Sequence, residues 1–123
     1  MKVIQKGFKM INIDKKLGRI SINLKAMYVG DDLLIVLSGG DRPHIGGISY
    51  GGLDDDKQTI SFKNHKDCIL SDLFSKEISK IFKGNYVICS GVHLDNITKE
   101  EINQVQDLSK EILEEMILIM REK

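Results

Sequence analysis

Three short polar stretches hold the three histidines of the chain, and each lies between segments whose pattern predicts helices or strands. "GGDRPHIGG" surrounds His44, "NHKD" contains His65 and "SGVHLDN" contains His93. Imidazole, guanidinium and carboxylate groups bind anions, transfer protons or bind metals. Because the loops at strand ends commonly hold functional residues, these three stretches are the candidate sites.

The first stretch belongs to a segment, Ser38–Gly52, that holds six of the eleven glycines and the only proline. Glycines let consecutive amides converge on an anion, and Arg42 is suited to a bidentate contact with a phosphate. The residues of such a loop would be Gly39, Gly40, Arg42, Pro43, His44 and Gly46. The segment lacks the residue order of a P-loop or of a dinucleotide fingerprint, so a plain turn made rigid by Pro43 explains it equally well.

The other two stretches each precede a predicted helix, whose N-terminus attracts negative charge. In the second, Asp67 is suited to cap the helix, whereas His65 and Lys66 have no evident structural role and are candidates to face an acidic ligand. The third offers Gly91, His93, Asp95 and Asn96. Taken alone, its sequence favours the simpler interpretation, in which Asp95 and Asn96 shape the turn before the helix.

A metal site and a catalytic triad have little support. Three histidines and Asp95 would suffice on paper for zinc or iron, but no HxH, HxxxH or HExxH spacing is present. Cys89 is predicted within a strand, and Ser38 and Ser90 lack a nucleophile-elbow motif. A small hydrolase or metal enzyme remains only as a third hypothesis.

Hydropathy periods predict which elements position these stretches. Alternation or short apolar runs predict strands at 8–13, 18–29, 33–37, 45–50, 57–63 and 85–94. Helical spacing predicts helices over 69–82 and from Thr98, where Thr98 and Glu101 form a capping box, almost to the C-terminus. The predicted fold is a two-layer α+β sandwich, in which two helices cover one face of a mostly antiparallel sheet of five to six strands. The first five strands are expected to form a meander, with "DKKLG" as a hairpin connection.

Composition indicates one domain over residues 1–123 with no bulk charge for attracting nucleic acid or membranes, since 18 basic residues balance 18 acidic ones. Cys68 and Cys89 are expected to be free thiols, and the absence of a signal-peptide or membrane-span pattern predicts a cytoplasmic protein. The long apolar stripe of the last helix predicts more surface than one sheet covers, and therefore a homodimer. A dimer formed through the sheet is the alternative.

Taken together, "GGDRPHIGG", "HKD" and "SGVHLDNITKEEI" resemble the bacterial proteins similar to the D subunit of gallate decarboxylase. These are described as prenylated-flavin chaperones, related in fold to proteasome assembly chaperones. The matching positions are Gly39, Gly40, Pro43, His44, Ile45, Gly46, His65, Lys66, Asp67, Gly91, His93, Asp95 and Asn96. Gly47 departs from the pattern, which has a small residue with a Cβ atom, such as alanine, at this position.

The resemblance implies a protein that is not an enzyme and that helps deliver prenylated FMN to a UbiD-type decarboxylase. Glycine amides, Arg42, Lys66 and the imidazoles suit a flavin phosphate and the ring's polar edge, and Tyr50 is the nearest aromatic candidate for stacking. The alternative is a ligand-free assembly chaperone or dimeric scaffold. The 39–46 connection is expected to pack against the 91–96 loop, with Gly51–Gly52 as a separate turn.

Overall fold

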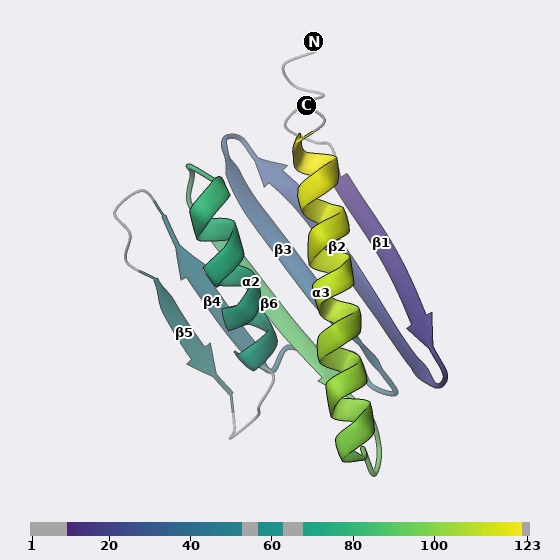
Figure 1. The fold of residues 1–123 in the computed structure, drawn as a ribbon. Coiled ribbons are helices and arrows are strands. Elements are labelled where there is room, and N and C mark those ends of the chain that lie inside the picture. Colours follow the sequence, from purple (N-terminus) through teal and green to yellow (C-terminus); the bar gives the residue numbers. More distant parts are fainter. Residues whose placement is uncertain (1–9, 53–56, 63–67, 122–123) are drawn as a thin grey trace.

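Six strands and two helices make up the part of the chain that the computed structural model describes, residues 10–52, 57–62 and 68–121. They are β1 (Met10–Leu17), β2 (Ile20–Val29), β3 (Asp32–Gly40), β4 (Gly47–Gly51), β5 (Gln58–Ser61), α2 (Cys68–Ile81), β6 (Tyr86–His93) and α3 (Lys99–Arg121). The strands form one sheet, and both helices lie on the same face of it (Figure 1). The predicted α+β sandwich is therefore confirmed. None of the helices within these ranges is long and apolar enough to span a membrane.

β1 and β2 form a hairpin that is longer than the sequence predicts. Their pairing runs from Met10↔Met27 to Leu17↔Ile20, so most of "DKKLG" belongs to β1 and not to a connection. Gly18, at φ 59°, and Arg19 alone make the turn. Charged residues suit the end of β1 because this strand is at the edge of the sheet, where one face meets water.

β6 lies inside the sheet, between β3 and β4, in the order β1-β2-β3-β6-β4-β5. It pairs in parallel with β3, from Leu33↔Tyr86 to Gly40↔His93, and antiparallel with β4. The predicted meander is therefore wrong beyond β3. The other pairings are antiparallel, so the sheet is mostly antiparallel as predicted. An apolar run such as Leu33–Leu37 indicates an interior strand but does not select its neighbour.

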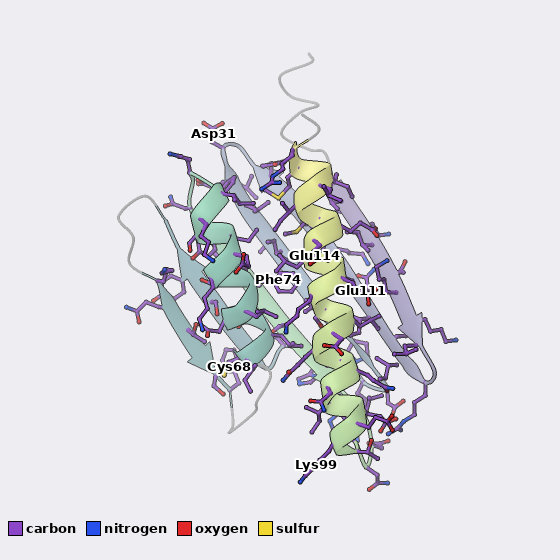
Figure 2. The ribbon with its side chains drawn as sticks, viewed as in Figure 1. Asp31, Cys68, Phe74, Lys99, Glu111 and Glu114 are labelled. Carbon is purple, nitrogen blue, oxygen red and sulfur yellow. The ribbon has the colours of Figure 1, made fainter. Side chains whose placement is uncertain are left out.

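The helices bury their apolar faces on one side of the sheet, which we call the inner face. Helix α2 buries Phe74 (Figure 2) and, equally completely, Ile78. Helix α3 buries Val105, Leu108, Ile112, Leu113 and Met116. The capping box is confirmed: the amide of Thr98 donates to Glu101 Oε1 and that of Glu101 to Thr98 Oγ1, both at 3.1 Å. The sheet thus covers most of the stripe that led us to expect a second subunit on α3.

The opposite side of the sheet, the outer face, is covered by neither α2 nor α3 (Figure 1). Strand register places a set of uncharged side chains side by side on β3, β6, β4 and β5, and we call it the outer apolar patch: Leu34, Val36, Val87, Cys89, Ile48, Tyr50 and Ile60. On β1 and β2 the same face is polar toward the β1–β2 turn, with Asn12, Asp14, Asn23 and Lys25, whereas Met10 and Met27 continue the apolar row beside Leu34. Only the part of β1 and β2 near the turn has the composition of a water-facing sheet surface.

Candidate functional site

The connection between β3 and β4, residues 41–46, crosses β6 on the outer face at Gly91. The Gly46 amide donates to the Ser90 carbonyl oxygen at 2.8 Å, and a Cβ atom at Gly91 would overlap the carbonyl oxygen of His44. Glycine is thus required at position 91 by the close approach of two backbones. The expected packing of this connection against the 91–96 segment is observed, although Gly39 and Gly40 belong to β3.

Parallel pairing of β3 and β6 brings the first and third polar stretches together. Gly40 is in register with His93, and the Asp41 amide donates to the His93 carbonyl oxygen at 2.6 Å. Gly40 has φ 78°, and a Cβ atom there would overlap the same carbonyl group. Because the carboxyl ends of parallel strands meet at one edge of a sheet, side chains 50 residues apart in sequence become neighbours.

His44 and His93 form an edge-to-face pair of imidazoles, with ring centroids 6.4 Å apart and an interplanar angle of 76°. Nδ1 of His44 lies 3.1 Å from the carbonyl oxygen of Arg42. A carbonyl oxygen only accepts hydrogen bonds, so Nδ1 of His44 carries a proton. Both rings are half-buried. The structure therefore unites two of the three histidines in one partly exposed cluster.

Asp95 holds His93 and Arg42 with a single carboxylate oxygen. Its Oδ1 lies 2.8 Å from Arg42 Nη2 and 3.0 Å from His93 Nε2. A carboxylate only accepts hydrogen bonds, so Nε2 of His93 carries a proton. Nε2 of His93 and Nη2 of Arg42 are 3.3 Å apart because both donate to the same oxygen of Asp95. The hydrogen bonds from Arg42 and then His93 lower the pKa of Asp95, which keeps its carboxylate ionised.

Arg19 joins this cluster from the β1–β2 turn, and the sequence reasoning missed it. Its Nε and Nη2 donate to the two carboxylate oxygens of Glu101 at 2.7 and 2.8 Å, and Nη2 also donates to the Asp95 carbonyl oxygen at 2.8 Å. The hydrogen bond from Arg19 and the Thr98 amide lower the pKa of Glu101 to about 2, and the same carboxylate raises the pKa of Arg19. In the sequence, Arg19 is one exposed polar residue beside an alternating strand, so only the tertiary fold identifies it.

The remaining predicted residues have structural duties or lie elsewhere. A Cβ atom at Gly39 would overlap the backbone of Ser21, and Asn96 adopts φ 54° in the turn before α3. Pro43 is an exposed residue of the connection, and Gly46 holds it to β6. His65, Lys66 and Asp67 lie outside the described residues.

Two further positions that the sequence singled out are also explained. Gly47, which departs from the family pattern, faces α2, and a Cβ atom there would lie 2.6 Å from the Cα atom of Cys68. Tyr50 is in register with Val87, six residues before His93. At roughly 3.3 Å per residue along a strand, Tyr50 is about 20 Å from the histidine pair and does not belong to the cluster.

Neither cysteine belongs to the cluster. Cys68 and Cys89 are half-buried and form no disulfide, and burial raises the pKa of the Cys89 thiol, which keeps it protonated. Cys89 lies in the outer apolar patch between Val36 and Ile48. Among the residues that the structure describes, no group of three or more histidine, cysteine or acidic side chains has a metal-binding arrangement.

Comparison with known proteins gives this arrangement a family. The sequence model of the family described as the prenylated flavin chaperone LpdD-like domain matches residues 16–121. Protein LpdD of Lactiplantibacillus plantarum is 34% identical, over 69% of this chain and 69% of that protein. A chain from the crystal structure of a chaperone complex for yeast 20S proteasome assembly has a TM-score of 0.55 at 13% identity, covering 92% of this chain and 96% of that chain. At that identity the likeness concerns the fold alone.

The matched region contains every described part of the site, from Arg19 in the first hairpin to Glu101 in the last helix. The family is one of chaperones, so the protein acts as a chaperone and is not an enzyme, as the resemblance of the three polar stretches implies. From its fold, its site and these matches, the chain belongs to the family of LpdD-like prenylated flavin chaperone domains.

Proposed function

We propose that this protein binds prenylated FMN, or FMN, and delivers it to a UbiD-type decarboxylase in the cytoplasm. The observation that carries the proposal is the cluster of His44, His93 and Arg42, which the fold of a flavin-chaperone domain assembles at one end of its uncovered sheet face. The residues proposed to contact the ligand are Gly39, Gly40, Arg42, Pro43, His44, Gly46, His65, Lys66, Gly91, His93, Asp95 and Asn96.

The donors of the described cluster fit a flavin nucleotide. The guanidinium of Arg42 has five N–H donors, and it contacts Asp95 through Nη2. The Arg42 side chain is 71% exposed. Arg42 is suited to the phosphate, and the two imidazoles are suited to the phosphate or to the polar edge of the ring. The prenylated flavin itself would supply the chemistry of the decarboxylase, and this chain would only hold and release it.

Binding at this cluster depends on directed hydrogen bonds more than on bulk charge. The two arginines, Arg19 and Arg42, face three carboxylates, those of Asp41, Asp95 and Glu101, so these groups together carry no net positive charge. An anion is therefore held by hydrogen bonds from individual donors that these carboxylates orient. No strong net electrostatic attraction opposes the release of the ligand to its recipient. This property suits a carrier.

The outer apolar patch supports protein partners. Val87, Tyr50 and Ile60 are 39%, 39% and 46% exposed, and they lie on neighbouring strands of the outer face, which neither α2 nor α3 covers. A contiguous apolar surface of this kind typically contacts another protein. We assign this patch to a second copy of the chain when no decarboxylase is bound. The patch is uncharged and the chain has a net charge of zero, so no electrostatic repulsion opposes the association of two copies.

A ligand-free assembly chaperone is the second candidate function, and the same apolar patch favours it. The two functions differ in the cluster, because a scaffold tolerates alanine at His44 and His93 and a flavin carrier does not. The decisive measurement is therefore a titration of the purified protein with FMN and with prenylated FMN, followed by addition of the loaded protein to an apo-decarboxylase of the UbiD type.

For a carrier we expect saturable binding of at least one of the two flavins and a gain of decarboxylase activity. His44→Ala and His93→Ala should each weaken binding about tenfold, since each removes a polar contact to a charged or polar ligand group. Lys83→Ala, an exposed residue before β6 at the opposite end of that strand from His93, is the matched control and should bind as the wild type does. If neither flavin binds, or if both histidine variants bind normally, the carrier function is wrong.

A further inference from the structure

Arg19 contacts every segment that surrounds the histidine cluster, although it belongs to none of the three polar stretches. We propose that Arg19 is the positioning residue of this site: it fixes Asp95 and thereby sets the orientation of His93 and Arg42. The effect on ligand affinity rests on the proposed function, whereas the positioning itself concerns this chain alone.

The amide, the carbonyl oxygen and Oδ1 of Asp95 each have a partner, and Arg19 contacts both the carbonyl oxygen and the group that accepts the amide. Arg19 Nη2 donates to the Asp95 carbonyl oxygen at 2.8 Å. The Asp95 amide donates to Oδ2 of Asp41 at 3.0 Å, and Arg19 Nη1 lies 3.6 Å from that same oxygen. The Asp95 carboxylate is then directed at His93 and Arg42. A rotation of the Asp95 backbone would therefore separate the donors that it holds.

Glu101 keeps Arg19 in place from the first turn of α3. Its two carboxylate oxygens accept the bidentate pair of hydrogen bonds from Arg19, and Oε1 also accepts the Thr98 amide of the capping box. A guanidinium presents several donors in a fixed planar fork, whereas a lysine ammonium is a flexible point charge. Lysine at position 19 can satisfy Glu101 or the Asp95 carbonyl group but does not reproduce the fork.

Positioning can be separated from stability because the chain offers a matched ion pair elsewhere. Lys15 and Glu115 also join β1 to α3, at 3.1 Å, and neither contacts the cluster. Exposed ion pairs contribute little to global stability, so the thermal unfolding of the Lys15 variant shows what the loss of a neighbouring ion pair to α3 costs on its own. Only the loss of the Arg19 pair should change the site. Glu101→Gln is informative as well, since glutamine preserves a capping box while removing the charge.

The experiment compares Arg19→Gln, Arg19→Lys and Glu101→Gln with Lys15→Gln in the ligand-free protein. Hydrogen exchange of the Asp95 amide and the ¹⁵N shifts of the His93 ring report the geometry, and thermal unfolding reports stability. We expect about tenfold faster exchange and an altered Nε2 signal in Arg19→Gln, the loss typical of one charge-assisted hydrogen bond. Arg19→Lys and Glu101→Gln should lie in between, and Lys15→Gln should match the wild type.

Binding of FMN and prenylated FMN to the same variants separates this proposal from the proposed function. Affinity should fall with the loss of Asp95 protection, about tenfold in Arg19→Gln. If the wild type binds neither flavin but Asp95 still loosens in Arg19→Gln, the carrier function fails and the positioning role stands. If Asp95 exchange and the His93 ring signals are unchanged in Arg19→Gln, or change equally in Lys15→Gln, the positioning role is overturned.

Discussion

Asp95 shows how one side chain sets the protonation of its neighbours. Because its carboxylate only accepts, the His93 nitrogen that faces it carries a proton, and a neutral His93 ring therefore has its lone pair on Nδ1. His44 has the opposite arrangement, with the proton on the nitrogen that faces the Arg42 carbonyl group. In their neutral forms the two rings thus differ in tautomer, with the proton on Nδ1 in His44 and on Nε2 in His93.

Glu101 makes the stability of the folded protein depend on pH in the acid range. Its pKa falls from 4.5 to about 2 in the folded protein, so its ionised form contributes stability above pH 4.5 that is lost as the pH falls toward 2. Glu101→Gln removes this contribution at every pH. We expect the midpoint of thermal unfolding to decrease less steeply between pH 4.5 and 2 in Glu101→Gln than in the wild type. Equal slopes in calorimetry would contradict the assigned role of Glu101.

At the scale of elements, local sequence signals were sufficient to locate the helices and strands but not to predict which strands pair. The capping box located the start of α3, and alternation located β2 with its buried face, because both signals lie within a few neighbouring residues. The insertion of β6 between β3 and β4 depends on contacts between residues about 50 positions apart, which no local pattern contains. The approach of His44 to His93 follows from that insertion.

The same limit explains which site residues the sequence identified. His44, Arg42, His93 and Asp95 are unusual in type and context, and the fold brings them together. Arg19 resembles any exposed arginine, and it becomes informative only when the β1–β2 turn is placed beside the start of α3. Gly39, Gly40 and Gly91 have a structural duty besides the ligand contact proposed for them, because a Cβ atom at each would overlap a neighbouring backbone.

Gly91 allows a direct test of how the crossing connection is held. Gly91→Ala should cost about 2 kcal/mol of unfolding free energy, since the new methyl group must displace the His44 carbonyl group. Gly30→Ala is the control: Gly30 has φ 64° but no heavy atom within 4 Å of the added Cβ atom, so it should cost only about 1 kcal/mol, from backbone strain. Denaturant unfolding measures both. If Gly91→Ala is as stable as the wild type, the connection is not held as described.

At the scale of the whole molecule, the two faces of the sheet have different tasks. The inner face forms the core with α2 and α3, which is where most of the apolar side chains are buried. The outer face carries the histidine cluster at one end and the outer apolar patch beside it. A second copy that covers the patch would lie next to the cluster, so dimerisation and ligand binding would share one surface, and a decarboxylase that displaces the second copy would meet the ligand directly.

The outer apolar patch allows a direct test of self-association. Ile48 lies in the patch between Cys89 and Ile60, so Ile48→Lys places a charge where two copies would meet. Sedimentation equilibrium should report twice the 13.9 kDa chain mass for the wild type and a single chain for Ile48→Lys. Leu118→Lys, at a position of α3 that is 60% exposed, is the control and should remain dimeric. A monomeric wild type, or a dimer that Leu118→Lys disrupts and Ile48→Lys does not, would show that two copies do not associate through the outer face.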